Sequence, residues 1–338
     1  MAETAAGRVN GTLSVEQRIP NPKKRRLSAE RALSLSRAAE AKRDAIELQL
    51  SLQLRNAYWT YYQAYEHQAI LRQSRSLLEQ VGGSIESRIA ASSASQADLL
   101  RLNNQIAEID ANLARLQAQV SSSQSQINGL LHREPSAPLP KPKLSGVAPS
   151  ARSLSIAASS HPEIRAAMER SSAASQSLRL AKLARSPDYQ AGLSYGNVSS
   201  DGLAPSANGR DQVMASIGMT IPLWETKNRA LEAEARATLQ AAEATTDSLR
   251  SSLRSEAAAA TADITAQQQV IELFETRILP DAQQAFDLST TAYASEKASF
   301  NDLIDAWRQQ LSYQQQQASN RAMLGKATAR FKQATGQK

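Results

Sequence analysis

The sequence has no cysteine and very few aromatic residues. Cys is absent from the 338 residues, and Phe, Trp and Tyr together make up 4% of them. Without Cys the chain can form no disulfide, thiol nucleophile or Cys-ligated metal site. So few aromatic side chains cannot fill a bulky core, whereas the abundant Ala, Ser, Gln, Leu and Arg favour helix. We therefore expect long helices that bury a narrow apolar stripe against their neighbours.

Long apolar runs are missing as well. No stretch of the sequence approaches the roughly 20 apolar residues of a membrane-spanning helix. The opening residues, MAETAAGRVNGTLS, contain no apolar core of a signal peptide. The sequence therefore predicts neither a spanning helix nor an export signal in this chain.

Positive charge is in excess but scattered. The net charge is +7, and the one dense cluster is Lys23-Lys24-Arg25-Arg26. Such a cluster can bind nucleic acid or a membrane surface. A basic turn where a strand passes into a helix is the simpler interpretation, so we expect no nucleic-acid partner.

What the sequence does contain is an internal duplication. The segment MASIGMTIP at Met214–Pro222 has the same residue pattern as TLSVEQRIP at Thr12–Pro20. In the same way, AYASEKASFNDLI at Ala292–Ile304 resembles RIAASSASQADLL at Arg88–Leu100. A duplication at matched places defines the architecture before any single residue is interpreted. Each copy predicts a strand, a long helix, a Ser-rich break and a second helix. We assign residues 1–143 to the first repeat and residues 144–338 to the second.

Alternation of apolar and polar residues predicts the strands. It occurs at Thr12–Pro20, and again at Tyr189–Tyr195 and Val213–Ile221, where two runs flank a polar loop and predict a hairpin. Apolar side chains on one face and small or polar ones on the other suit a barrel strand that faces lipid. A half-buried hairpin of a soluble protein gives the same pattern, so both interpretations stay open here.

Helical patterns fill most of the remaining chain. Residues 27–91 contain no Pro and carry a cluster of aromatic residues between Tyr58 and Tyr65, which we interpret as a packing belt between helices. A heptad seam is typical of coiled-coil packing and consists of Leu102, Ile106, Ile109, Leu113, Leu116 and Val120.

Prolines mark the ends and irregularities of the other helices. A Pro-rich linker follows the seam at His132–Lys143, and Pro162 should open a helix that runs to about Arg185. Residues 224–294 form a second long stretch, which Pro280 should kink or break. The segment 299–336 mirrors 95–131.

These segments resemble the TolC-type outer membrane factors, a family of outer membrane efflux proteins. IPNPKKRRLSAERA and IPLWETKNRALEAEA resemble the strand-to-helix junctions of that family, and ILPDAQQAFDLSTTAYASEKASFNDLIDAWRQQL resembles the turn at its periplasmic tip. The resemblance covers essentially the whole chain. It is closest to the branch that serves heavy-metal resistance-nodulation-division (RND) pumps.

The resemblance implies a fold and a setting. The fold is mainly α, a long α-helical coiled-coil barrel with a small membrane β-barrel contribution, built by a homotrimer. The family has a helix and a strand before the segment matching Thr12–Pro20, whereas eleven residues precede it here, so we expect three strands and a truncated first repeat. The resemblance also implies a passive exit duct in the bacterial outer membrane, with helices in the periplasm. An adaptor protein and an inner-membrane RND transporter would deliver its substrates, with metal cations among the candidates.

Functional residues are implied at the helical tip. Asp302 and Asp305, three residues apart, match the family's gate carboxylates and would form two acidic rings in a trimer. Tyr293 matches an aromatic latch position, and Asp98 is a further tip residue. Ser299-x-x-Asp302 and Ser95-x-x-Asp98 also fit helix capping boxes, and Tyr293 also fits simple packing between helices. Arg88 and Arg308 are candidate partners of these acids.

No other chemistry is indicated. The histidines His67, His132 and His161 are far apart and lack ligand spacing, so we expect them at the surface, in the linker or at a helix start, and we predict no metal site. No nucleophile, paired catalytic carboxylates or phosphate loop stands out, so we expect neither an enzyme nor a cofactor. Two other classes remain open: a structural coiled-coil protein without transport, and a periplasmic adaptor. An adaptor should have one hairpin flanked by strand-rich segments, which the duplication does not favour.

Overall fold

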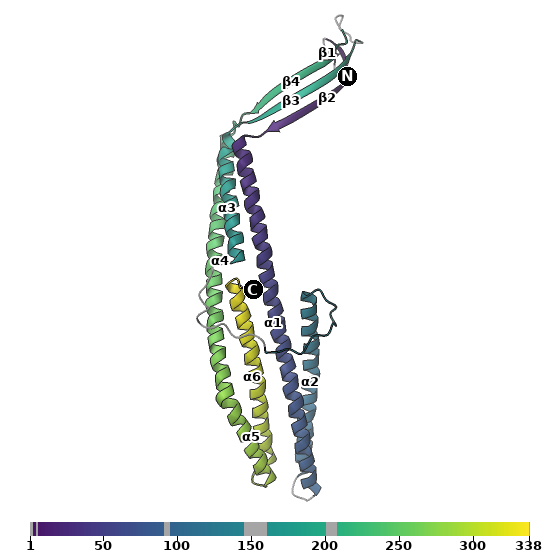
Figure 1. Ribbon diagram of the computed structural model, residues 1–338, viewed down its shortest axis with the longest axis vertical. Coiled ribbons are helices and arrows are strands. Elements are labelled where there is room, and N and C mark those ends of the chain that lie inside the picture. Colours follow the sequence, from purple (N-terminus) through teal and green to yellow (C-terminus); the bar gives the residue numbers. More distant parts are fainter. Residues whose placement is uncertain (1–2, 5, 91–94, 145–160, 201–207, 338) are drawn as a thin grey trace. The chain divides into compact units, whose positions relative to one another are not determined.

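The computed structural model describes the chain except residues 1–2, 5, 91–94, 145–160, 201–207 and 338. It contains long helices and one small sheet (Figure 1). The strands are β1 (Glu3–Thr4), β2 (Gly7–Ile19), β3 (Asp188–Ser199) and β4 (Gln212–Thr220). The helical elements are α1 (Pro22–Ala90), α2 (Gln96–Leu130), α3 (Pro162–Lys182), η3 (Leu183–Arg185), α4 (Glu225–Leu273), η4 (Phe274–Ile278), α5 (Leu279–Ala294) and α6 (Phe300–Ala334).

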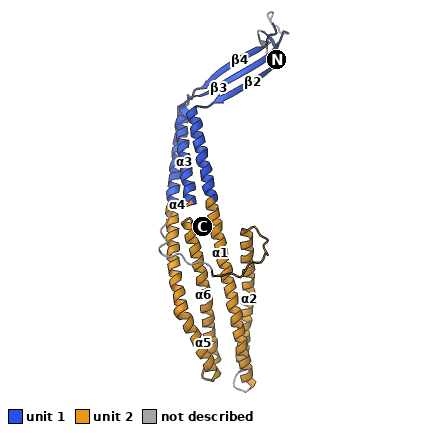
Figure 2. Cartoon of the chain, in the orientation of Figure 1, with its two compact units in different colours: residues 1–43, 162–249 blue, residues 44–161, 250–338 orange. Residues whose placement is uncertain are grey.

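The chain divides into two compact units (Figure 2). The first comprises residues 1–43 and 162–249, and the second comprises residues 44–161 and 250–338. Each unit therefore takes residues from both sequence repeats. The repeat boundary at residue 143 stays a prediction.

The first unit holds an antiparallel sheet with the strand order β1-β2-β3-β4. The predicted hairpin is confirmed in β3 and β4, and the strand predicted at Thr12 begins earlier, at Gly7. The expectation of three strands is wrong, because the two-residue β1 pairs with the start of β2. Gly7 makes this turn with φ +134°, and a Cβ at that position would collide with the carbonyl oxygen of Ser199.

The second unit is built from helical hairpins with a shared apolar core. Its largest cluster lies between α1, α2, α5 and α6 and includes Leu71, Leu78, Ile85, Leu102, Ile109, Phe286, Tyr293, Phe300, Leu303, Ile304 and Trp307. The heptad seam is confirmed: Leu102, Ile109 and Val120 are buried, and its other members are partly buried. The Ser-rich break falls between α1 and α2, where residues 91–94 lie outside the described part of the chain.

The aromatic belt in α1 is also confirmed. Tyr61 packs with Val120 and Ile127 of α2, while Trp59 and Tyr62 pack with Ala322 of α6. Because α1 carries both sets, it buries two different stripes against two neighbours.

Pro280 neither breaks nor sharply ends the helix. The turn before it, η4, is π-helical, and the N–H of Leu279 donates to the carbonyl of Phe274 five residues earlier. A proline inside an α-helix lacks a donor and collides with the carbonyl four residues back. A widened turn relieves that collision and keeps the chain helical.

The Pro-rich linker is held against the helices rather than hanging free. The fully buried Asn128 donates from Nδ2 to the carbonyls of Pro135 (3.1 Å) and Ala137 (2.8 Å). The Tyr58 hydroxyl donates to the Lys143 carbonyl (2.6 Å) and accepts from the Lys143 N–H (2.9 Å). These bonds satisfy main-chain groups that have no regular structure to pair them.

His67 and His161 are placed more deeply than expected, whereas His132 is exposed where the linker begins, as predicted. His161 precedes α3 at a helix start, as predicted, but it is fully buried with Nε2 2.9 Å from the Gln333 carbonyl. His67 is not a surface residue: its Nε2 lies 3.0 Å from the Gln315 carbonyl, between α1 and α6. The pKa of His67 is lowered, chiefly by burial.

Candidate functional site

The sheet of the first unit has one mainly apolar face, interrupted by Gln17 of β2. Residues directly opposite each other in antiparallel strands point to the same face. The register therefore aligns Leu13, Tyr195 and Val213 in one row, Val15, Leu193 and Ala215 in the next, and Ile19, Tyr189 and Met219 at the end. Nearly all of these side chains are exposed, and Ile217 of the same face reaches 90% exposure. Nothing in the described chain covers this face.

The opposite face of the sheet is mostly polar or small, with Met214 as an exposed apolar member. Its rows contain Glu16, Gly192 and Ser216, and then Arg18, Gln190 and Gly218. A Cβ on Gly192 or Gly218 would press into the side chain across from it, Ser216 or Gln190. One sheet thus separates a mainly apolar surface from a mainly polar one.

The edges of this sheet are open within the described chain. β4 pairs only with β3, and β2 pairs on its outer side only with the two residues of β1. Open edges present unpaired N–H and C=O groups that are costly away from water. The sheet therefore has the form of a segment of a larger structure.

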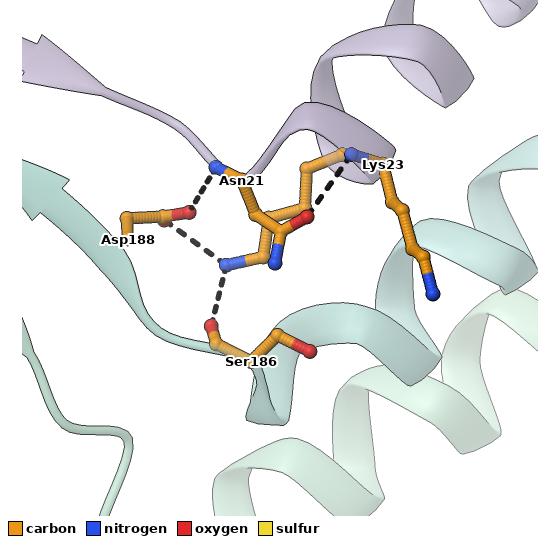
Figure 3. A network of polar contacts seen from close by, with 5 residues as sticks. Asn21, Lys23, Ser186 and Asp188 are labelled. Carbon is orange, nitrogen blue, oxygen red and sulfur yellow. Dashed lines mark hydrogen bonds and ion pairs between the residues drawn. The ribbon is translucent and has the colours of Figure 1, made fainter.

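A polar network fixes the junction between the sheet and the helices (Figure 3). The Asp188 carboxylate accepts from the N–H of Asn21 (3.0 Å) and from Lys24 Nζ (3.0 Å). Lys24 Nζ also donates to the carbonyl of Ser186 (2.8 Å). The start of α1 is thereby tied to the start of β3. The basic cluster lies at the strand-to-helix junction as expected, but within the first turns of α1 rather than in a separate turn.

At the tip of the second unit, Tyr293 is enclosed by its neighbours. Its ring packs edge-on against Phe300 with the ring centroids 6.1 Å apart, and the Arg88 guanidinium lies 4.6 Å from the ring centroid. The Tyr293 hydroxyl is buried and has no hydrogen-bond partner among the described residues. Burial is the main cause that raises the pKa of Tyr293. The contacts within one chain are those of a packing residue.

Asp302 caps a helix. Ser299 is the N-cap of α6, its hydroxyl accepts from the Asp302 N–H, and the Asp302 carboxylate accepts from the Ser299 N–H (2.9 Å) in return. Bonds from the Ser299 hydroxyl and N–H lower the pKa of Asp302. The expected capping box is thus present at this end of the second repeat.

Asp305 has no such structural task. Its side chain is 75% exposed, and among the described residues it forms an ion pair with Arg308 on the next turn, at 3.6 Å. Arg308 also donates from Nε to Gln105 of α2 (3.1 Å). The sequence tied Arg308 to no specific carboxylate, and the structure pairs it with Asp305.

Asp98 behaves differently from its counterpart in the second repeat. Ser95 is the N-cap of α2, but its hydroxyl accepts from the Ala97 N–H rather than from the Asp98 N–H that a capping box uses. The Asp98 carboxylate lies 3.7 Å from Arg101. Asp98, Tyr293 and Ser299 line one open cavity of about 580 Å³ together with Arg88, Arg101 and Glu296.

Two further features concern the helices and metals. Within the residues that the structure describes, no helix is both long enough and apolar enough to cross a membrane. Those residues also contain no group of three or more His, Cys, Asp or Glu side chains arranged to hold a metal ion.

The comparison with protein families assigns the chain. The family of outer membrane efflux proteins matches residues 153–337, which is more than half of the sequence. The chain therefore belongs to the outer membrane efflux protein family. No curated protein sequence matches it.

Solved structures with the same fold are outer membrane channels and related proteins. VceC, the outer membrane protein of Vibrio cholerae, is 21% identical with a TM-score of 0.84, over 96% of this chain and 79% of VceC. The MtrE outer membrane channel of Neisseria gonorrhoeae is 19% identical with a TM-score of 0.79, over 97% and 80%. CusC is 15% identical with a TM-score of 0.81, over 97% and 83%. The mainly helical fold with a small sheet is thus the fold of these proteins.

Proposed function

We propose that this protein is a passive exit duct of the bacterial outer membrane, with its helices in the periplasm. The observation that carries the proposal is the exposed apolar face of the β2–β3–β4 sheet on a member of an efflux family. In water that face would expose a large apolar patch, which monomeric soluble proteins rarely do. In lipid it matches the outward face of a barrel strand.

The duct is a homotrimer in this proposal. A sheet with open edges is not stable in a bilayer, because the unpaired backbone groups find no water there. Copies of the same chain supply matching edges at β4 and β2 and close the barrel. The polar face of the sheet then lines the lumen.

The tip residues form the gate of the duct. Asp305, exposed and not used as a cap, contributes a ring of carboxylates when three copies meet. Asp302 contributes a second ring while it caps α6. Tyr293 and Asp98 hold the neighbouring hairpins together at the tip. Carboxylates brought together in closed rings attract cations and repel one another. The gate opens when the tip helices move apart and separate these carboxylates.

The partners are a periplasmic adaptor and an inner-membrane RND-type transporter that supplies the driving force. Metal cations are the substrate class that the sequence resemblance favours. The duct itself has no catalytic step, because transport through it follows the gradient that the pump creates. Substrate selection then belongs to the pump.

Single-channel conductance in planar bilayers tests the proposal. The detergent-extracted full chain should assemble as a trimer by native mass spectrometry and give small, cation-preferring currents. Asp305→Asn should raise the leak and reduce cation preference, and Glu272→Gln, an exposed acid of α4 away from the tip, serves as the control. A chain that is released without detergent as a monomer in plain buffer would be a structural coiled-coil protein instead.

A further inference from the structure

We propose that the sheet-to-helix junction of the first unit binds the anionic headgroups of membrane phospholipids. The surface consists of exposed cations at the starts of α1 and α4 and at the ends of α3 and η3, together with Tyr189, Leu223 and Trp224. It rests on the proposed function for the membrane insertion of the sheet. The recognition of anionic lipid is a separate property of these side chains.

The junction carries a large excess of positive charge. Residues 20–30, 182–189 and 222–230 contain eight cations and three acids, namely Lys23, Lys24, Arg25, Arg26, Lys182, Arg185, Lys227 and Arg229 against Glu30, Asp188 and Glu225. Each of the three acids already pairs with one cation, Arg26, Lys24 and Arg229 respectively. Five cations are left for which the described chain offers no ion pair, and their charge is available to an external anion.

These segments meet at one end of one sheet. Ile19 of β2, Tyr189 of β3 and Met219 of β4 are paired neighbours in the last rows of the sheet. Adjacent strands lie about 4.8 Å apart, so the chain leaves β2 and β4 at points roughly 10 Å from each other. The starts of α1 and α4 therefore lie at the same end of the sheet (Figure 1).

Folding within the chain accounts for two members of the basic cluster, Lys24 and Arg26, and Arg26 pairs with Glu30 on its own helix. Lys24 is held by Asp188 and Ser186. The N–H of Lys23 donates to Asn21 Oδ1, but the Lys23 side chain points away from that network (Figure 3) and, like that of Arg25, is exposed. The first turn of α1 contains no acid, although the positive end of a helix dipole favours acids and disfavours cations. Lys23 and Arg25 thus oppose the stability of their own helix, which an external anion would offset.

Exposed apolar and aromatic side chains stand beside these cations. Trp224 is 75% exposed and Leu223 77% exposed, directly before α4, and Tyr189 lies in the last row of the apolar face. Trp and Tyr gather at the level of lipid headgroups, with basic side chains just outside them. The apolar face of the sheet is therefore followed by aromatic residues and then by cations. A bilayer changes in the same order, from acyl chains to the interface and then to the phosphate groups. This continuity favours a lipid surface over an acidic protein.

Lipid selectivity of the reconstituted protein tests this inference. The full chain is placed in phosphatidylcholine vesicles, and electron paramagnetic resonance measures the immobilised fraction of spin-labelled phosphatidylglycerol and of spin-labelled phosphatidylcholine. Each cation near the surface contributes a preference of roughly fivefold for anionic lipid at low salt. We expect phosphatidylglycerol to be favoured at least fivefold, and the preference to fall in 1 M NaCl.

A matched pair of variants assigns the preference to the junction. Lys23→Gln/Arg25→Gln should lower the ratio at least threefold. Arg37→Gln/Lys42→Gln removes one Lys and one Arg from exposed positions of the same helix, at least about 18 Å further along it and beyond the screening length. This control should keep the wild-type ratio.

Each result separates the two proposals. An equal immobilised fraction for the two lipids in the wild type, or an equal loss in both variants, overturns the headgroup site and leaves the duct intact. No immobilised lipid of either kind means that the sheet does not enter the bilayer, and the proposed function itself then fails.

Discussion

Arg88 of α1 donates a 2.6 Å hydrogen bond from Nη1 to the main-chain carbonyl of Tyr293 of α5, and its guanidinium also lies over the Tyr293 ring. One side chain thus holds both the backbone and the ring of its partner. The contact joins two hairpins whose residues are 205 positions apart in the sequence. It is the kind of connection that a gate at this tip would have to break.

Truncation of Tyr293 should open and destabilise the tip. Tyr293→Ala removes a buried ring, which costs about 3–5 kcal/mol in well-packed cores. Tyr293→Phe keeps the ring and removes a hydroxyl that lacks a partner in the described chain, so stability and leak current should stay close to wild type. Thermal unfolding and bilayer conductance measure the two effects. A Phe variant that leaks as much as the Ala variant would assign the latch to the hydroxyl.

Loss of the α6 cap should loosen the start of that helix. Ser299→Ala removes the N-cap hydroxyl and should cost about 1 kcal/mol. Hydrogen exchange at residues 300–304 is the direct measurement. Ser95→Ala, the equivalent change at α2, is the matched variant and should affect only its own helix.

The same cap should depend on pH. The folded pKa of Asp302 lies below its ordinary value, so the unfolded chain takes up the proton first as the pH falls. The stabilisation is therefore complete above the unfolded pKa of about 3.9 and is lost as the pH drops through the lower folded value. Asp302→Asn should show a smaller decline of tip protection over that acidic range. Equal declines in wild type and variant would show that the carboxylate does not stabilise the tip.

Substitution of Asn128 should release the linker. Asn128→Ala removes one of the two side-chain donors of the Pro135 and Ala137 carbonyls, because Ser125 and Gln124 still donate to them, and the loss of these two hydrogen bonds should cost about 1–3 kcal/mol in total. Limited proteolysis should then cut residues 132–143 faster. Gln63→Ala, which removes a side-chain bond between α1 and α6, is the control and should leave the linker resistant.

Two glycines should respond in opposite directions to the same change. A Cβ on Gly325 would overlap the Trp59 ring, so Gly325→Ala should destabilise the second unit by about 1–3 kcal/mol. Gly83 has open space around it within α1, and Gly83→Ala should stabilise the helix by about 0.5–1 kcal/mol. Thermal melting of both variants checks the pair. Similar shifts would mean that helix propensity outweighs the contact with Trp59.

Local patterns in the sequence predicted most of the helices and strands. The alternation before each Ile-Pro and the heptad spacing of Leu102 to Val120 arise from which side chains a strand or helix must bury, and these rules operate within a few residues. The capping box at Ser299 has the same local origin. The assignment of Asp302 and Asp305 to a gate, and of Tyr293 and Asp98 to packing or a latch at the tip, stays a prediction, because a gate depends on contacts between copies of the chain.

What the sequence did not predict depends on distant contacts. Tyr58 meets Lys143 and Arg88 meets Tyr293 only after the helices have paired, so no spacing in the sequence encodes either bond. The depth of His67 follows from the packing of α6 on α1 in the same way. The short strand β1 was missed because two residues are too few to show alternation.

The π-helical turn before Pro280 also sets which side chains of α5 face the core. Phe274 and Ala282, buried on either side, are eight residues apart rather than the seven of a regular heptad. The wide turn absorbs that additional residue. Deleting one residue there would turn α5 by about 100° around its axis and point Phe286 and Tyr293 away from the core they now fill. The phase of the whole tip therefore depends on a single extra amino acid some twenty positions upstream.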